Sequence, residues 1–223
     1  MTGELPCPSC GAPVPVRSAA LPYVTCAYCQ TLIRRHGDGL EAIGKSAVLP
    51  FDVSPIQLGT TGSFATIRFS VVGRVRWGWA DGAWNEWLCD CSDGTPRWLG
   101  EAMGAFMLTE EHAELLNRPE LKIIQSGIEP PRGTRLTLGD EQFEAVDLKS
   151  ARCLGSEGDL PRPTPAGAEV LNIDFRGNRG GVLSLQRDAD GPSAWLGQAL
   201  ELAQLKPANL RALAGWTIPA GLK

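Results

Sequence analysis

Residues 66–108, TIRFSVVGRVRWGWADGAWNEWLCDCSDGTPRWLGEAMGAFML, decide the fold. Apolar and polar residues alternate through Thr66–Trp77, and the pattern resumes over Trp84–Cys91 after a turn at Ala80–Ala83. A second turn, Ser92–Thr95, leads into a third extended run over Pro96–Leu108. Alternation with a period of two, interrupted by Asp-Gly turns, is typical of antiparallel strands joined by hairpins. The stretch therefore predicts a mainly β protein built on a small antiparallel β-barrel or curled sheet.

The second half of the chain echoes this stretch. Trp98–Met103 resembles Trp195–Leu200, and an Asp-Gly turn precedes each of them. We interpret residues 46–125 and 126–223 as two related β-units, because self-similarity within a chain indicates a repeated structural unit. The second unit is expected to carry a Gly- and Pro-rich insertion over Gly155–Gly167.

Two local elements depend on this reading. Leu196–Leu205 alone fits a helix, but its counterpart in the first unit contains two glycines, which favours a strand. One short helix is predicted at Glu110–Leu116, with Thr109 as its N-cap and Pro119 beyond its end.

Four cysteines form two Cys-x-x-Cys pairs, Cys7/Cys10 and Cys26/Cys29, with fifteen residues between the pairs. Each pair can direct two thiolates at one ion, and four thiolates complete the tetrahedral site that suits Zn²⁺. We predict a zinc ribbon over residues 1–45, held together by a structural Zn²⁺ because so short a piece cannot form a sufficient core. An iron centre of the rubredoxin type uses the same ligands. A pair of redox-active motifs is the other alternative.

Composition limits the location and the partners. The formal charge of −4 argues against binding to a phosphate backbone. No apolar run reaches the ~18–20 residues of a membrane span, and the first residues lack the features of a secretion signal. A cytoplasmic protein is expected, in which disulfides do not form. The three remaining cysteines, Cys89, Cys91 and Cys153, are expected to be small buried residues without a function.

The residues quoted so far resemble a bacterial family known only as domain of unknown function number 4178. The resemblance rests on CPSCGAPV and CAYC in the cysteine region, and on SPIQLGTTGSF, FSVVGRV and WNEWLCDCSDGTPRWLGEA in the first β-unit. It implies a β-rich fold, often preceded by a zinc ribbon, and a gene neighbourhood of polyamine-synthesis and membrane-stress genes. It supplies no catalytic residues, and the second β-unit departs most from the pattern.

No catalytic motif is found. The two histidines, His36 and His112, lie beside the ribbon and in the expected surface helix, where neither has a nucleophile as a partner. The sequence has no Gly-x-Ser-x-Gly elbow, Walker loop or His-Glu-x-x-His. Gly177–Gly181 is interpreted as a hairpin turn and not as a phosphate-binding loop. The sequence therefore predicts a protein that is not an enzyme.

Tryptophans and acidic residues gather in the first β-unit. Residues 46–125 contain six basic and ten acidic residues, a local formal charge of −4. Aromatic rings beside carboxylates bind cations. The candidate ligand-binding residues are Trp77, Trp84, Glu86, Trp87, Asp90 and Trp98. A polyamine, another cation or a basic segment of a partner would suit such a surface; alternatively, these tryptophans belong to the core.

Three classes of function are compatible with these sequence features. The first is a binding module for a cation, in a polyamine or membrane-stress setting. The second is a scaffold or adaptor, in which the ribbon docks a protein partner. The third is a nucleic-acid-binding zinc-ribbon protein, supported by the small basic group Arg17, Arg34 and Arg35 and opposed by the acidic remainder. A hydrolytic or transferase enzyme with an unrecognised site is a further alternative.

Overall fold

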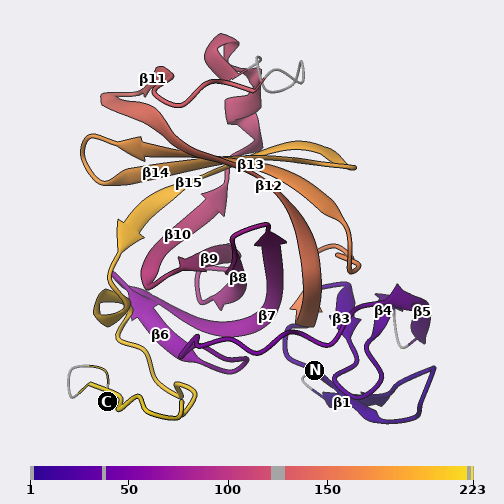
Figure 1. Ribbon diagram of the computed structural model, residues 1–223. Helices are drawn as coiled ribbons and strands as arrows, with labels where there is room; N and C mark the ends of the chain where they lie inside the picture. Colours follow the sequence, from indigo (N-terminus) through magenta and orange to yellow (C-terminus); the bar gives the residue numbers. More distant parts are fainter. Residues whose placement is uncertain (1–2, 37–38, 122–128, 220–221, 223) are drawn as a thin grey trace.

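The computed structural model describes residues 3–36, 39–121, 129–219 and 222, and strands dominate it (Figure 1). The strands are β1 (Gly3–Pro6), β2 (Pro13–Val16), β3 (Tyr23–Thr25), β4 (Thr31–His36), β5 (Gly39–Lys45), β6 (Thr61–Phe64), β7 (Ile67–Trp79), β8 (Gly82–Cys91), β9 (Arg97–Ala102), β10 (Ala105–Glu111), β11 (Arg135–Leu138), β12 (Glu141–Leu160), β13 (Glu169–Gly177), β14 (Gly181–Asp188) and β15 (Gly191–Leu200). The described residues also form the short 3₁₀ helices η1 (Ala113–Asn117), η2 (Pro119–Leu121) and η3 (Leu202–Leu205). The mainly β fold class with a curled antiparallel sheet is confirmed. No helix among the described residues has the length and apolar character needed to cross a membrane.

Eight strands form a closed ring. Hydrogen-bonded neighbours follow the order β7-β8-β9-β10-β15-β14-β13-β12, and β12 also pairs with β7. Every pairing around the ring is antiparallel. Successive side chains of a strand point to opposite faces. The ring therefore has an inner face, to which both halves of the chain contribute (Figure 1).

The strands β6–β10 and β11–β15 follow one plan. Each set begins with a hairpin and continues as a meander of four strands. The Gly59 N–H donates to the Val71 carbonyl at 2.8 Å, and the Gly133 N–H donates to the Ala145 carbonyl at the same distance. Both glycines have φ of +84°. That one unit was duplicated, and that its copies begin at residues 46 and 126, stay predictions.

Strand β12 closes the ring and joins it to the cysteine region. It pairs with β13 from Phe143 to Arg152, with β7 from Cys153 to Gly158, and with β3 from Gly158 to Leu160. Gly158 thus meets two strands at once, with φ of +73°. A Cβ at this position would lie 2.2 Å from the Val72 carbonyl oxygen. Only glycine fits there, because real Cβ atoms need more than 3 Å of separation from such an atom.

The N-terminal residues form two small pieces of sheet. Strands β1 and β2 pair only with each other, whereas β3, β4 and β5 extend the main sheet from β12. The apolar cluster around the cysteines contains five buried residues among those described, Cys7, Val14, Val24, Cys26 and Ile33. Two of these are cysteines of the predicted metal site.

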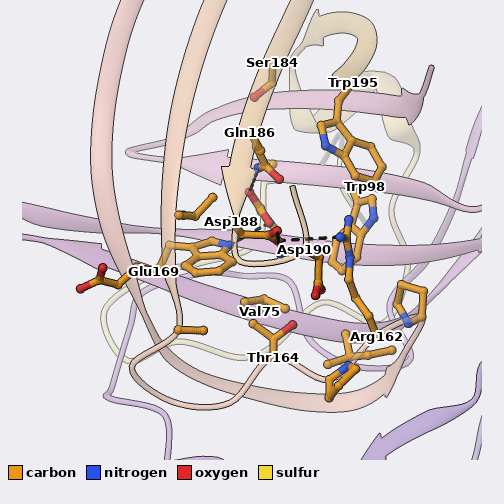
Figure 2. Close-up of a pocket in the computed structure, with 18 of the residues that line it drawn as sticks. Val75, Trp98, Arg162, Thr164, Glu169, Ser184, Gln186, Asp188, Asp190 and Trp195 are labelled. Atoms are coloured by element: carbon orange, nitrogen blue, oxygen red, sulfur yellow. Dashed lines mark hydrogen bonds and ion pairs between the residues drawn. The ribbon is translucent and has the colours of Figure 1, made fainter. Parts of the chain in front are cut away.

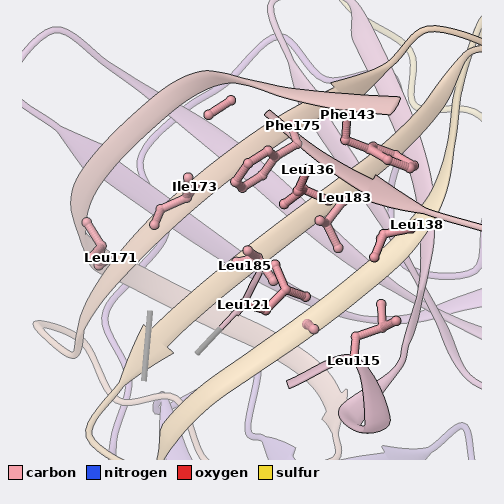
Figure 3. Close-up of a cluster of buried hydrophobic side chains, with 12 residues drawn as sticks. Leu115, Leu121, Leu136, Leu138, Phe143, Leu171, Ile173, Phe175, Leu183 and Leu185 are labelled. Carbon is pink, nitrogen blue, oxygen red and sulfur yellow. The ribbon is translucent and has the colours of Figure 1, made fainter. Parts of the chain in front are cut away.

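Apolar side chains on the outer faces of the two meanders form separate cores. On β13 and β14, Ile173, Phe175 and Leu183 pack against Leu115 of η1 and Leu121 of η2 (Figure 3). On β7–β10 the corresponding core centres on Val71, Trp87 and Leu99, and Leu205 of η3 covers it. A third apolar cluster, which includes Val75, Trp77 and Val170, lies on the inner face of the ring, so this face combines apolar and polar residues.

The predicted helix at Glu110–Leu116 is wrong. Strand β10 continues through Glu111, and only a 3₁₀ turn follows, at Ala113–Asn117. Thr109, the expected N-cap, pairs with Trp98 of β9 and Gly197 of β15. Pairing on both edges satisfies the backbone groups that the cap would have satisfied, so tertiary structure overrides the local signal.

Two other local predictions change in part. The run Pro96–Leu108 consists of two strands, because Met103 and Gly104 form a hairpin turn with φ of +48° and +80°. In the expected insertion Gly155–Gly167, residues 155–160 belong to β12, so the loop begins at Pro161.

The prediction of a strand at Leu196–Leu205 is confirmed as far as Leu200, where β15 ends. The hairpin turn at Gly177–Gly181 is confirmed between β13 and β14.

Candidate functional site

Two tight turns present the four N-terminal cysteines. The Gly11 N–H donates to the Cys7 carbonyl at 2.9 Å, and the Gln30 N–H donates to the Cys26 carbonyl at the same distance. Gly11 and Gln30 have φ of +74° and +60°, so each turn ends on a left-handed residue. These two matching turns direct both Cys-x-x-Cys pairs toward one point between them.

The sulfur positions fit a single metal ion. The four Sγ atoms lie within 4.8 Å of one another, with 3.7 Å between Cys7 and Cys29 and 3.9 Å between Cys10 and Cys26. A tetrahedral ion with Zn–S bonds of about 2.3 Å places its sulfurs about 3.8 Å apart. A disulfide would need about 2.05 Å, and all seven cysteines are free thiols. Cys7, Cys10, Cys26 and Cys29 can therefore bind a metal ion, and the donor set is consistent with zinc.

At this site a neighbouring hydroxyl group favours the thiolate form of Cys29, whereas desolvation and the nearby sulfurs raise the pKa of Cys10 to about 12. The hydroxyl of Thr31 lies 3.1 Å from the Cys29 sulfur, and this hydrogen bond lowers the pKa of the Cys29 thiol to about 6.

The prediction that Cys89, Cys91 and Cys153 are buried is confirmed, since their exposed fractions are 0%, 8% and 2%. Burial raises the pKa of all three thiols, which keeps them protonated and unreactive.

A cavity of about 290 Å³ opens inside the ring (Figure 2). It is lined by side chains of β7, β8, β9, β10, β13, β14 and β15, and by the loop that follows β12. Its aromatic wall includes Trp98 and Trp195, whose rings meet edge to face at a centroid distance of 6.4 Å. Ser184 and Gln186 add polar groups from β14. The cavity thus combines aromatic surface with hydrogen-bonding groups, as small-molecule sites commonly do.

Glu86 is an acidic residue whose side chain is held by hydrogen bonds inside the ring. Its carboxylate accepts three hydrogen bonds, from Trp77 Nε1 at 2.8 Å, Trp84 Nε1 at 3.1 Å and Gln186 Nε2 at 2.8 Å. All three donors are uncharged. Burial raises the pKa of Glu86, and the nearby carboxyl group of Asp174 acts in the same direction. The site positions an anion and, among the described residues, gives it no basic partner.

A carboxylate on the outer side of the ring, that of Asp52, is paired with basic residues. Asp52 accepts hydrogen bonds from Arg74, Arg211 and Arg76, the last at 2.7 Å. Its side chain is only 5% exposed, so its charge is compensated within the protein. A buried charge without such a partner is costly. Glu101, 8% exposed on the same outer side, accepts from Ser54, Asn85 and Trp87 and, like Glu86, forms no ion pair among the described residues. What distinguishes Glu86 is that its carboxylate lines a cavity.

The cavity carries more acidic than basic groups. Four acidic residues line it, Glu86, Glu169, Asp188 and Asp190, and Arg162 is the one basic residue among the described lining residues. The Arg162 guanidinium lies 3.7 Å from Asp188, and Figure 2 shows it reaching toward that residue. The cavity therefore has a net negative charge in its unprotonated state.

The six predicted ligand-binding residues do not form one surface. The three that line the cavity are Trp77, Glu86 and Trp98. Trp84 lies behind them, where it binds Glu86 and its ring stacks on Trp77 at 6.3 Å. Trp87 is 1% exposed in the outer core and donates to Glu101 at 2.9 Å. Asp90 is exposed and is not among the lining residues.

Sequence reasoning missed the contributions of the second half. Ser184, Gln186 and Asp188 occupy alternate positions of β14, and Trp195 of β15 faces the same cavity. The period-two spacing of these polar residues between Leu183, Leu185 and Arg187 was a signal for a polar inner face. What it could not give was the pairing of β15 with β10, which brings these strands opposite Glu86.

A closed antiparallel ring with a four-cysteine unit at its edge defines a β-rich protein with a candidate metal centre. Comparison with family models matches residues 57–202 to the family described as domain of unknown function (DUF4178), and the chain belongs to this family. The matched region begins just before β6 and ends just after β15, so it contains the whole ring and excludes the cysteine unit. No curated protein and no solved structure matches the chain.

Proposed function

We propose that this protein is a non-enzymatic, cytoplasmic binding module that holds a structural Zn²⁺ at its four cysteines and takes a small organic cation into the ring cavity. The observation that carries the proposal is the carboxylate of Glu86, held by three uncharged donors and lacking a basic partner among the described residues. The donors keep the carboxylate in place and leave its charge available to a ligand.

The energetics favour a cationic ligand over a neutral one. A charged group in a partly dry site interacts more strongly with an opposite charge than it would in water. Aromatic rings such as those of Trp77 and Trp98 add about 0.5–2 kcal/mol for each ring that a cation contacts. A neutral ligand would leave the partly buried charge of Glu86 uncompensated, as it is without a ligand.

The size of the cavity limits the ligand. A volume of about 290 Å³ lies at the lower end of the range for small-molecule sites, which is about 300–1,000 Å³. A polyamine, or one basic side chain of a partner protein, is of suitable size and charge. The family resemblance supports a polyamine or membrane-stress setting. In that setting the cysteine unit would act as an adaptor for a protein partner.

Spermidine is expected to quench the tryptophan fluorescence of the protein, and Glu86→Gln is expected to weaken its binding about tenfold to a hundredfold. The loss of a buried, charge-assisted interaction has this magnitude. A fluorescence titration measures it. Asp90→Asn is the matched control, because Asp90 lies outside the cavity and its variant should bind as the wild type does. An unchanged spectrum at millimolar spermidine, or equal binding by Glu86→Gln, would overturn the proposal.

Binding should also weaken as the pH falls. The ligand needs the charged form of Glu86, and burial raises the pKa of this group. Protonation, and with it the loss of affinity, therefore begins at a higher pH than for an ordinary glutamate, whose pKa is about 4.3. The dissociation constant for spermidine, which stays cationic, should rise as the pH is lowered stepwise from about 8. A wild-type affinity that is flat down to the ordinary range of glutamate would contradict the role of Glu86.

A further inference from the structure

The loop between β12 and β13 carries the one basic side chain among the described residues that line the cavity. Its sequence is Pro161-Arg162-Pro163-Thr164-Pro165. Each proline fixes its own φ, and each restricts the residue before it to extended conformations. Arg162 and Thr164 both precede a proline. The backbone that carries Arg162 is therefore stiff.

Hydrogen bonds fix the loop to β12. The Thr164 carbonyl accepts from Ser156 Oγ at 3.2 Å, and the Gly167 N–H donates to the Cys153 carbonyl at 2.8 Å. A turn with a 3.1 Å bond from the Ala168 N–H to the Pro165 carbonyl completes the anchor. Because the backbone is held at both sides, movement at this edge of the cavity is left to the Arg162 side chain.

The Arg162 side chain is held weakly. Its Nη1 atom lies 3.7 Å from Asp188 Oδ2, which exceeds the length of a hydrogen bond. It makes no hydrogen bond to another described residue, although a guanidinium has five N–H donors. The side chain is 38% exposed. It thus places a positive charge in an acidic cavity without being fastened there.

We propose that Arg162 is a built-in competitor, whose guanidinium holds the cation position at Asp188 until a ligand displaces it. The inference rests on the proposed function of the cavity. A ligand with one cationic group can bind at Glu86 and leave Arg162 in place. A ligand with a second cationic group that reaches Asp188 must replace Arg162. Arg162 therefore determines how much binding free energy a ligand with several positive charges loses by displacing it.

The test compares spermidine with n-butylammonium on the full-length protein. Arg162→Gln should bind spermidine about three- to tenfold more tightly than the wild type, because one competing charge is removed. The affinity for n-butylammonium should change less. Arg162→Lys keeps the charge and should retain the wild-type affinity for spermidine. Arg187→Gln removes a charge from β14 that lines a neighbouring groove and not this cavity, so it is the matched control.

The outcomes separate the two proposals when Glu86→Gln is measured beside these variants. If Glu86→Gln loses binding but Arg162→Gln gains none, the competitor role of Arg162 is wrong and the cation site stands. If Arg187→Gln gains as much as Arg162→Gln, the effect is one of net charge and the inference also fails. If Glu86→Gln binds as the wild type does, the cation site itself is wrong, and the inference falls with it.

Discussion

Replacing Cys26 by alanine is expected to reduce the metal content of the purified protein from about one ion per chain to nearly none. Cys26 is 0% exposed and belongs to the apolar cluster around the cysteines. Structural zinc sites supply about 10–16 kcal/mol of apparent binding free energy, which serves as folding free energy in so small a unit. The residues up to the end of β5 should therefore lose their tertiary structure together with the ion.

Two measurements check this result. Elemental analysis of the wild type gives the metal content and tells zinc from iron, and limited proteolysis of the variant should remove roughly the first 45 residues while the ring resists. Cys153→Ala is the matched control: Cys153 is 2% exposed inside the ring and should leave the metal content unchanged. A full metal complement in Cys26→Ala would show that these cysteines do not hold the ion.

Replacing Gly158 by alanine is expected to lower the free energy of unfolding by about 2–5 kcal/mol. A left-handed backbone costs an L-residue about 1–2 kcal/mol, and overpacking typically adds about 1–3 kcal/mol. Both costs apply here, because Gly158 has φ of +73° and its new Cβ would lie 2.2 Å from the Val72 carbonyl. The clash is with backbone, which cannot rotate away, at the position where β12 meets both β7 and β3.

Gly139→Ala separates the two costs. Gly139 has φ of +61°, and a Cβ there would meet no atom within 4 Å. The free energy of unfolding of this variant should fall only by the cost of the left-handed backbone, about 1–2 kcal/mol. Urea unfolding followed by tryptophan fluorescence gives both values. Equal losses for the two variants would mean that the contact between β12 and β7 is not tight at Gly158.

The elements that the sequence predicted correctly depend on local patterns. Alternation over Thr66–Trp77 and Trp84–Cys91 defines two strands, and the two Cys-x-x-Cys spacings are enough to group four thiols. Alternation also separates Trp87 from Trp84 and Glu86, since residues one apart point to opposite faces. This rule alone could have removed Trp87 from the candidate ligand set, but not Asp90, which has the same parity as Glu86 on β8.

The closed ring depends on pairings that no local pattern shows. Strand β12 reaches β7 across about 80 positions of sequence, and β15 reaches β10 across a similar distance. These two contacts bring Gln186 and Asp188 of the second half to Glu86 of the first half. The tryptophans of the first half were visible in the sequence, but the cavity that they share with the second half follows only from the closure.

The closure of the ring also determines the order in which parts of the chain can fold during synthesis. The cysteine unit precedes the ring in the sequence, and the two turns that present its thiols are local. The edges of β7 and β10 must wait for β12 and β15, and β15 ends at Leu200. During synthesis the first meander therefore has two unpaired edges, which are open to chaperones and to wrong strands. The metal can be loaded early, whereas the cavity comes into existence only after β15 has been made.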